Sequence, residues 1–187
     1  VTLELIRDKE NIRSINLRGI ARTLGCAHTN LYNHFSDLDG IFWDALDEIL
    51  DRSMVHLKNK LEKDKHPKDR LDNFYNSLIE FYIENRGWFT LFWMEKLHGT
   101  KSEKTMSKIR STMVEYNSIL KNIIQDHYKI NPSDQQVISL FHTVHCYLHG
   151  EISMFLCGRG LIDDKPAFTK QLLGECRKLS NLLVKSF

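Results

Sequence analysis

Apolar residues recur at steps of three and four along most of the chain, which is the spacing of amphipathic α-helices. Four long runs show this spacing: Leu71–Phe81, Met106–His127, Val137–Ile152 and Phe168–Leu183. The segment Trp88–Leu97 is apolar on almost every side, which predicts a short buried helix that ends near Gly99. Sustained alternation of apolar and polar residues, the mark of half-buried strands, is missing from the sequence. The pattern therefore predicts an all-α fold.

A change in composition divides the chain into two predicted parts. Near Lys58–Lys68 the sequence turns polar and basic, and Pro67 interrupts the helical spacing. We therefore expect a module of short helices over residues 1–50. A larger helical bundle, long enough to bury its own core, is expected over residues 51–187.

The most specific pattern lies between Asn16 and Phe35. Asn16 is placed to cap a short helix, and Gly25 is placed to end it in the left-handed conformation. A second helix is predicted from Ala27 to Phe35, with Leu31 and Phe35 on its buried side. Two short helices joined by a glycine turn form a helix-turn-helix, whose second helix can read base edges in the DNA major groove. The alternative is an ordinary helical hairpin whose polar side faces water.

The stretch Ile15–Leu46 resembles the DNA-binding domain of the TetR family of transcriptional repressors. The resemblance rests on I-A-x-x-L-G over residues 20–25, followed by L-Y-x-H-F over residues 31–35. It implies an N-terminal helix-turn-helix domain, followed along the chain by a helical domain that binds a ligand and forms a dimer. It also implies eight DNA-binding residues: Asn16, Arg18, His28, Thr29, Asn30, Tyr32, Asn33 and His34.

These eight residues have different implied roles. Asn16 corresponds to the cap of the first helix, and Arg18 and residues 28–30 fall where family members contact bases. Tyr32 and His34 match positions that meet the sugar-phosphate backbone, and Asn33 reaches either. The sequence departs from the family where a phosphate-binding lysine is common. That position is Leu38, between Asp37 and Asp39, so the sequence has no lysine for this contact.

The resemblance implies a ligand pocket in the C-terminal part, and the aromatic residues there would favour a small, largely apolar effector. The candidate pocket residues are Phe81, Trp88, Phe92, Met113, Tyr116, Phe141 and His145. The alternative for each of them is a plain hydrophobic core. The last helix, predicted over about Ala167–Lys185, carries an apolar stripe on an otherwise charged surface. The resemblance implies a homodimer through the last two helices, with two-fold symmetry.

The remaining candidates for chemistry are histidines and cysteines. His142, His145 and His149 share one stripe of a helix, but they span about 10 Å, too far for all three to bind one ion. Two of them with a residue from another helix could do so, although core or pocket-wall histidines are the favoured interpretation. The four cysteines form no C-x-x-C pair, which predicts free, mostly buried thiols. We expect no metal and no cofactor.

Composition narrows the possible functions. The 187 residues are 42% hydrophobic and 27% charged, with a net charge of +2, which indicates a globular protein with at most a local nucleic-acid surface. Apolar runs are too short for a membrane helix and a signal peptide is not supported, so a cytoplasmic location is expected. Enzyme motifs such as H-E-x-x-H are missing. The helix-turn-helix pattern and the resemblance together predict a ligand-responsive transcriptional regulator, expected to be a repressor, that binds a palindromic double-stranded operator. An effector-less DNA-binding dimer and, last, a helical enzyme are the alternatives.

Overall fold

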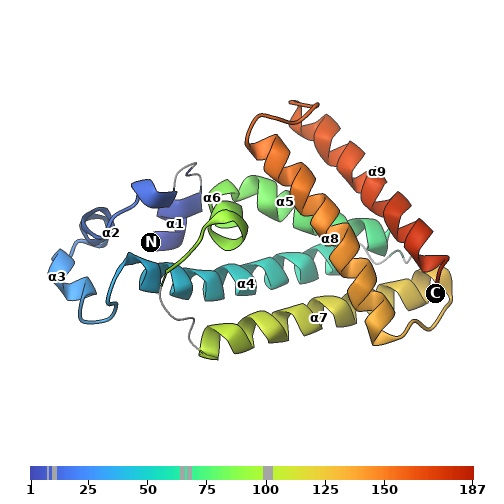
Figure 1. Cartoon of the computed structure of the whole chain (residues 1–187), viewed down its shortest axis with the longest axis horizontal. Coiled ribbons are helices and arrows are strands. Elements are labelled where there is room, and N and C mark those ends of the chain that lie inside the picture. The colour runs from blue at the N-terminus through green and yellow to red at the C-terminus, as the bar shows by residue number, and fades with distance from the viewer. Residues whose placement is uncertain (8, 10–11, 64–65, 67–68, 99–102) are drawn as a thin grey trace. The chain divides into compact units, whose positions relative to one another are not determined.

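The computed structural model describes residues 1–7, 9, 12–63, 66, 69–98 and 103–187 (Figure 1). Within these ranges it contains nine α-helices, one 3-10 helix and one π-helix, with no strand. The all-α prediction is therefore confirmed for the described residues. The expected interruption at Pro67 and the expected helix end at Gly99 lie outside them.

The described chain divides into two compact units. The first comprises Val1–Arg52 and Glu84–Ser111, and the second comprises Ser53–Ile83 and Thr112–Phe187. This differs from the expected division into 1–50 and 51–187, because residues Glu84–Ser111 group with the N-terminal residues. The first boundary, at Arg52, falls inside a continuous helix.

Close packing of α1 (Thr2–Arg7) on α6 (Arg86–Phe89) explains this grouping. The indole nitrogen of Trp88 donates a hydrogen bond to the carbonyl oxygen of Leu3 at 2.8 Å. Gly87 lies directly against the backbone of α1, since a Cβ atom there would be 1.7 Å from the carbonyl oxygen of Ile6. Both contacts join residues more than eighty positions apart.

The first unit also contains η1 (Ile12–Ser14), α2 (Leu17–Leu24), α3 (His28–Leu31), the π-helix η2 (Thr90–Met94) and the beginnings of α4 (Leu38–Lys63) and α7 (Glu103–Tyr128). Its core is aliphatic and aromatic. The fully buried side chains in this unit include Ile6, Ile12, Ile20, Phe42, Phe89 and Leu91. Each short helix therefore contributes one or two anchors to a shared core rather than being stable alone.

The predicted helix over Trp88–Leu97 is shorter than expected. Helix α6 passes into η2, which ends at Met94, and Glu95 is extended. Met94, expected to be interior, is 55% exposed. Beyond it, the carboxylate of Glu95 and the carbonyl oxygen of Lys96 accept hydrogen bonds from Arg13, so this stretch satisfies its polar groups outside a helix.

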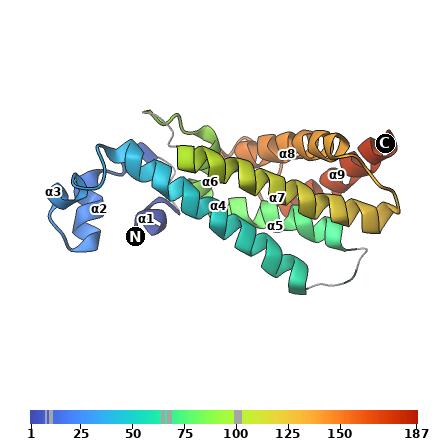
Figure 2. The same ribbon diagram turned by 90° about the horizontal axis from the view of Figure 1, so that it is seen from below.

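The second unit is built from the rest of α4 and α7, most of α5 (Arg70–Glu84), α8 (Asp134–Leu156) and α9 (Lys165–Val184). The four runs of helical spacing correspond to α5, α7, α8 and α9, which confirms these predictions. Helices α8 and α9 lie side by side (Figure 1 and Figure 2). Ser133 begins α8 with a capping box to Gln136, and Asp164 caps α9.

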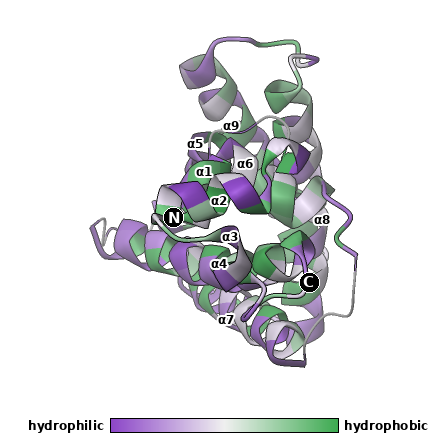
Figure 3. Cartoon of the chain, turned by 90° about the vertical axis from the view of Figure 1, so that its left-hand side faces the viewer, coloured by the Kyte–Doolittle hydropathy of each residue, from purple (hydrophilic) through white to green (hydrophobic). Residues whose placement is uncertain are grey.

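An aromatic cluster forms the centre of the second unit. The rings of Tyr116 and Phe141 stack with centroids 5.9 Å apart, and Phe74 meets both edge-on. Hydrophobic and hydrophilic residues alternate along the helices of the chain (Figure 3). The hydroxyls of Tyr75 and Ser180 are hydrogen-bonded at 2.8 Å in the interior, and burial raises the pKa of Tyr75.

Candidate nucleic-acid interface

Helix α2 begins and ends with the caps that its sequence predicts. The side-chain oxygen of Asn16 accepts a hydrogen bond from the amide of Gly19 at 2.9 Å. Gly25 has a φ of +69°, in the left-handed region that favours glycine, and its amide donates to the carbonyl of Arg22. The amide of Cys26 then bonds to Ala21 at 3.0 Å, which closes the turn toward α3.

Helix α3 is shorter than predicted. It spans only His28–Leu31 and continues as a tight turn through Tyr32 to His34. The amide of His34 bonds to Leu31 with three-residue spacing, and the amide of Phe35 returns to the same carbonyl at 2.9 Å. Leu31 is buried and Phe35 is partly buried, so the predicted inward side of this segment is present although its helix is brief.

The side of α2 and α3 opposite the core is polar and open. All eight predicted DNA-binding residues are exposed, and Tyr32 is 54% exposed. Ile20, Ala21 and Leu31 are buried beneath them. Leu24, the last residue of α2, is exposed beside Gly25.

A concave region joins the beginning of α2 to α3. It has a volume of about 520 Å³ and is lined by Asn16, Leu17, Arg18, His28, Tyr32 and Leu38. The His28 and Tyr32 rings meet edge-on with centroids 6.5 Å apart. The structure thus brings together four of the eight predicted residues, while Thr29, Asn30, Asn33 and His34 lie outside this lining. Guanidinium, imidazole, amide and phenol groups here can donate hydrogen bonds to phosphates and base edges.

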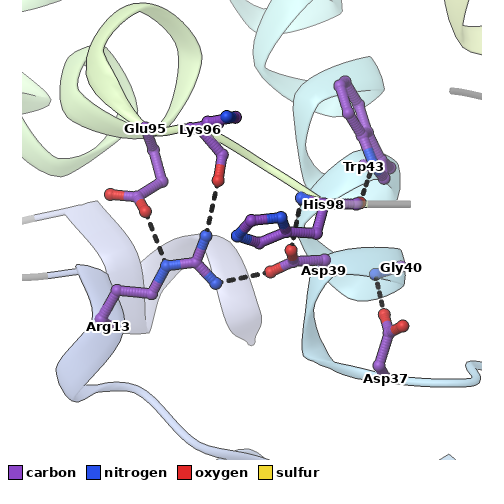
Figure 4. Close-up of polar contacts among 8 residues, drawn as sticks. All are labelled: Arg13, Asp37, Asp39, Gly40, Trp43, Glu95, Lys96 and His98. Atoms are coloured by element: carbon purple, nitrogen blue, oxygen red, sulfur yellow. Dashed lines mark hydrogen bonds and ion pairs between the residues drawn. The ribbon is translucent and has the colours of Figure 1, made fainter. Parts of the chain in front are cut away.

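The acids that begin α4 are engaged within the first unit (Figure 4). Asp37 accepts a hydrogen bond from the amide of Gly40 at 2.8 Å and so caps the helix. Asp39 is 7% exposed. It pairs with the guanidinium of Arg13 at 2.6 Å and accepts from the amide of His98 at 2.6 Å. The carboxylate of Asp39 is therefore held inside the first unit by an ion pair and a backbone amide.

Arg13 is a residue that sequence reasoning missed. Its guanidinium bonds to Asp39, to Glu95 at 2.6 Å and to the carbonyl of Lys96 at 2.8 Å. The hydrogen bond to Glu95, with that to Asp39, raises the pKa of Arg13. The partners are 26 to 83 positions away in the chain, so no local spacing could indicate them.

The predicted pocket residues do not come together in one unit. Trp88 and Phe92 belong to the first unit, where Trp88 is bonded to Leu3. The other five belong to the second unit, where Phe141 packs between Tyr116 and His145 as part of the core. None of them lines the concave region at α2 and α3 or two grooves within the second unit.

His145 lies in an apolar setting. Its Nε2 atom is 3.4 Å from the Tyr82 hydroxyl, and its ring lies 5.3 Å from that of Phe141. Burial lowers the pKa of His145 to about 4, with smaller effects from His149 and His142. The ring is therefore neutral near pH 7.

Metal-ligand residues are scattered over the described part of the chain. Within it, no group of three or more His, Cys, Asp or Glu side chains is placed to hold a metal ion. His142 contacts Cys146 at 3.8 Å on the surface of α8. The four cysteines are free, but only Cys176 is buried, which corrects the expectation of mostly buried thiols. Burial raises the pKa of Cys176 to about 12.

Comparison with known proteins informs the fold only. No family model matches the sequence, and no curated protein matches it. A solved structure described as a protein with unknown function from Rhodococcus sp. RHA1 is similar, with a TM-score of 0.74 and 17% sequence identity. The match covers 96% of this chain and 90% of that chain. At this identity the likeness shows a shared fold. Among the described residues, no helix is both long and apolar enough to cross a membrane.

Proposed function

We propose that this protein is a ligand-responsive transcriptional regulator, most simply a repressor, that binds double-stranded DNA as a homodimer. The exposed side of α2 and α3 is the proposed reading surface. The observation that carries the proposal is the arrangement of this segment. Three buried anchors, Ile20, Ala21 and Leu31, hold it, while all eight candidate DNA-binding side chains remain exposed. The sequence resemblance to TetR repressors supports the same function.

The proposed dimer joins copies through α8 and α9. Phe168, Leu172 and Cys176 of the predicted apolar stripe are buried within the chain. Other apolar side chains on these helices, Met154 and Leu182, are 46% and 63% exposed. A two-fold contact would bring the same exposed groups together from both copies. It would present two reading segments to half-sites about one duplex turn apart, roughly 34–36 Å.

The proposed effector is a small, largely apolar molecule held by the second unit. It can release DNA only by binding the conformation with mis-spaced reading segments more tightly than the DNA-binding one. An effector of equal affinity for both conformations would shift nothing.

Equilibrium binding to a duplex selected from a random pool tests the reading surface. Asn30→Ala and Tyr32→Phe should each weaken binding about tenfold, since each removes one hydrogen-bonding group from the interface. Asn59→Ala is the matched control, because Asn59 is an exposed α4 residue of the second unit. If both variants bind as tightly as the parent protein, the reading surface is assigned to the wrong residues.

A further inference from the structure

A groove in the second unit lies among the C-terminal half of α4, the beginning of α5 and the middle of α7. Its volume of about 560 Å³ is within the range of small-molecule sites. The residues that line it are Lys58, Leu61, Glu62, Arg70, Glu115, Ser118, Ile119 and Asn122. The groove therefore combines two aliphatic side chains with charged and amide groups, and none of these residues belongs to the predicted aromatic pocket.

Arg70 is the unusual member of this lining. It is partly buried at the first position of α5, and its Nε atom is buried without a hydrogen-bond partner. Within the described part of the chain, its guanidinium makes no hydrogen bond or ion pair. By contrast, Arg13, Arg52 and Arg177 each form an ion pair with a carboxylate. Burying one N–H of a guanidinium without an acceptor is unfavourable, so an anion in the groove that accepts a hydrogen bond from Nε would stabilise Arg70.

The other charges of the groove limit the kind of anion. Lys58 and Glu115 form an ion pair with each other at 2.5 Å, so neither offers a free charge. Glu62 is exposed and, among the described residues, has no ionic partner. One unpaired base and one unpaired acid line the groove, which suits a singly charged ligand and disfavours a dianion. The planar fork of a guanidinium matches a carboxylate with two parallel hydrogen bonds.

We propose that this groove binds a monocarboxylate with an apolar chain, whose carboxylate pairs with Arg70 and whose chain contacts Leu61 and Ile119. The carboxylate supplies the hydrogen-bond acceptor that Arg70 lacks within the fold, and the apolar chain packs on Leu61 and Ile119. The proposal identifies the chemical class of the effector and its binding site. That this ligand regulates DNA binding rests on the proposed function. Binding to the groove itself needs no DNA.

Calorimetric titration of the full chain with octanoate tests the site. Octanoate should bind once per chain, and Arg70→Met should weaken it about tenfold, the effect of losing a charged hydrogen-bonded pair. Glu62→Gln should strengthen binding a few-fold, because it removes the competing carboxylate. This gain cannot arise from misfolding. Arg159→Met is the matched control, since Arg159 is exposed and distant in sequence from the groove, and it should bind octanoate like the parent.

Two further ligands and one spectrum complete the test. Octanol, which has the chain without the charge, and octyl phosphate, which carries more charge, should bind more weakly than octanoate. Methyl NMR should show octanoate shifting the signals of Leu61 and Ile119. Equal binding by Arg70→Met, or equal binding of octanol, would overturn the site. Octanoate that binds through Arg70 but leaves the DNA complex intact would support the groove and contradict the effector part of the proposed function.

Discussion

His145 is a titratable residue whose charge the fold suppresses. The Tyr82 hydroxyl approaches it from α5, His142 and His149 flank it on α8, and Phe141 covers its ring. Burial lowers the pKa of His145 from 6.5 to about 4. Between these pH values the unfolded chain holds a proton that the folded chain lacks. The contribution of neutral His145 to the stability of the fold is therefore complete above about pH 6.5 and is lost as the pH falls toward 4.

This linkage predicts an acid-sensitive fold. The free energy of unfolding should fall by about 2 kcal/mol between pH 7 and pH 5 on account of His145 alone. Urea unfolding at the two pH values measures the loss, and His145→Gln should reduce it by that amount. If the parent and the variant lose equal stability on acidification, His145 is not held neutral by the fold.

Asn16 acts at the residue scale through a single hydrogen bond. Asn16→Ala removes the acceptor of the Gly19 amide and should destabilise the first unit by about 1 kcal/mol. Asn16→Asp keeps an acceptor at the same place and should preserve stability. Thermal unfolding followed by circular dichroism compares the two variants, and equal destabilisation by both would rule out the capping role.

At the scale of elements, the packing of α6 on α1 depends on the missing side chain of Gly87. A Cβ atom there would overlap the carbonyl oxygen of Ile6, which is backbone and cannot rotate away. Trp88 beside it is fixed by its bond to Leu3. Together with the bonds of Arg13 and Asp39 to residues 95–98, this contact joins the segment Glu84–Ser111 to the N-terminal residues.

The contact predicts opposite effects for the same substitution at two glycines. Gly87→Ala should destabilise the protein by at least about 1–3 kcal/mol, because the two backbones must separate. Gly150 lies in α8, with open space where a methyl group would be added. Gly150→Ala should therefore stabilise the protein by about 0.5–1 kcal/mol. Denaturant unfolding of the two variants gives the comparison. A neutral Gly87→Ala would contradict the close approach.

The sequence predicts the elements whose signals are local. The period of apolar residues identifies α7 and α9, and Asn16 and Gly25 mark the ends of α2. The exposure of the candidate DNA-binding residues follows from the same local pattern. Contacts between distant segments could not be predicted, since Arg13 has partners far away along the chain. The sequence also could not predict that the Nε atom of Arg70 lacks a hydrogen-bond partner, because this depends on which side chains surround the groove.

For the whole molecule, the proposal requires two copies acting together. Light scattering of the purified protein should give about twice the 22.0 kDa mass of one chain. Leu182→Glu places a charge on the exposed apolar side of α9 and should shift the protein toward the monomer. Val55→Glu alters a similarly exposed apolar residue of α4 and should leave the dimer intact. A monomeric parent at micromolar concentration would contradict the dimer.

The most direct test of the regulator proposal is selection of bound duplexes from a random DNA pool by the unmodified protein. We predict enrichment of one sequence made of two inverted half-sites with centres about 10 base pairs, or a whole multiple of a duplex turn, apart. The complex should contain two chains per duplex, and its affinity should fall as salt rises. A pool that shows no enriched sequence after repeated selection would contradict sequence-specific DNA binding by this protein.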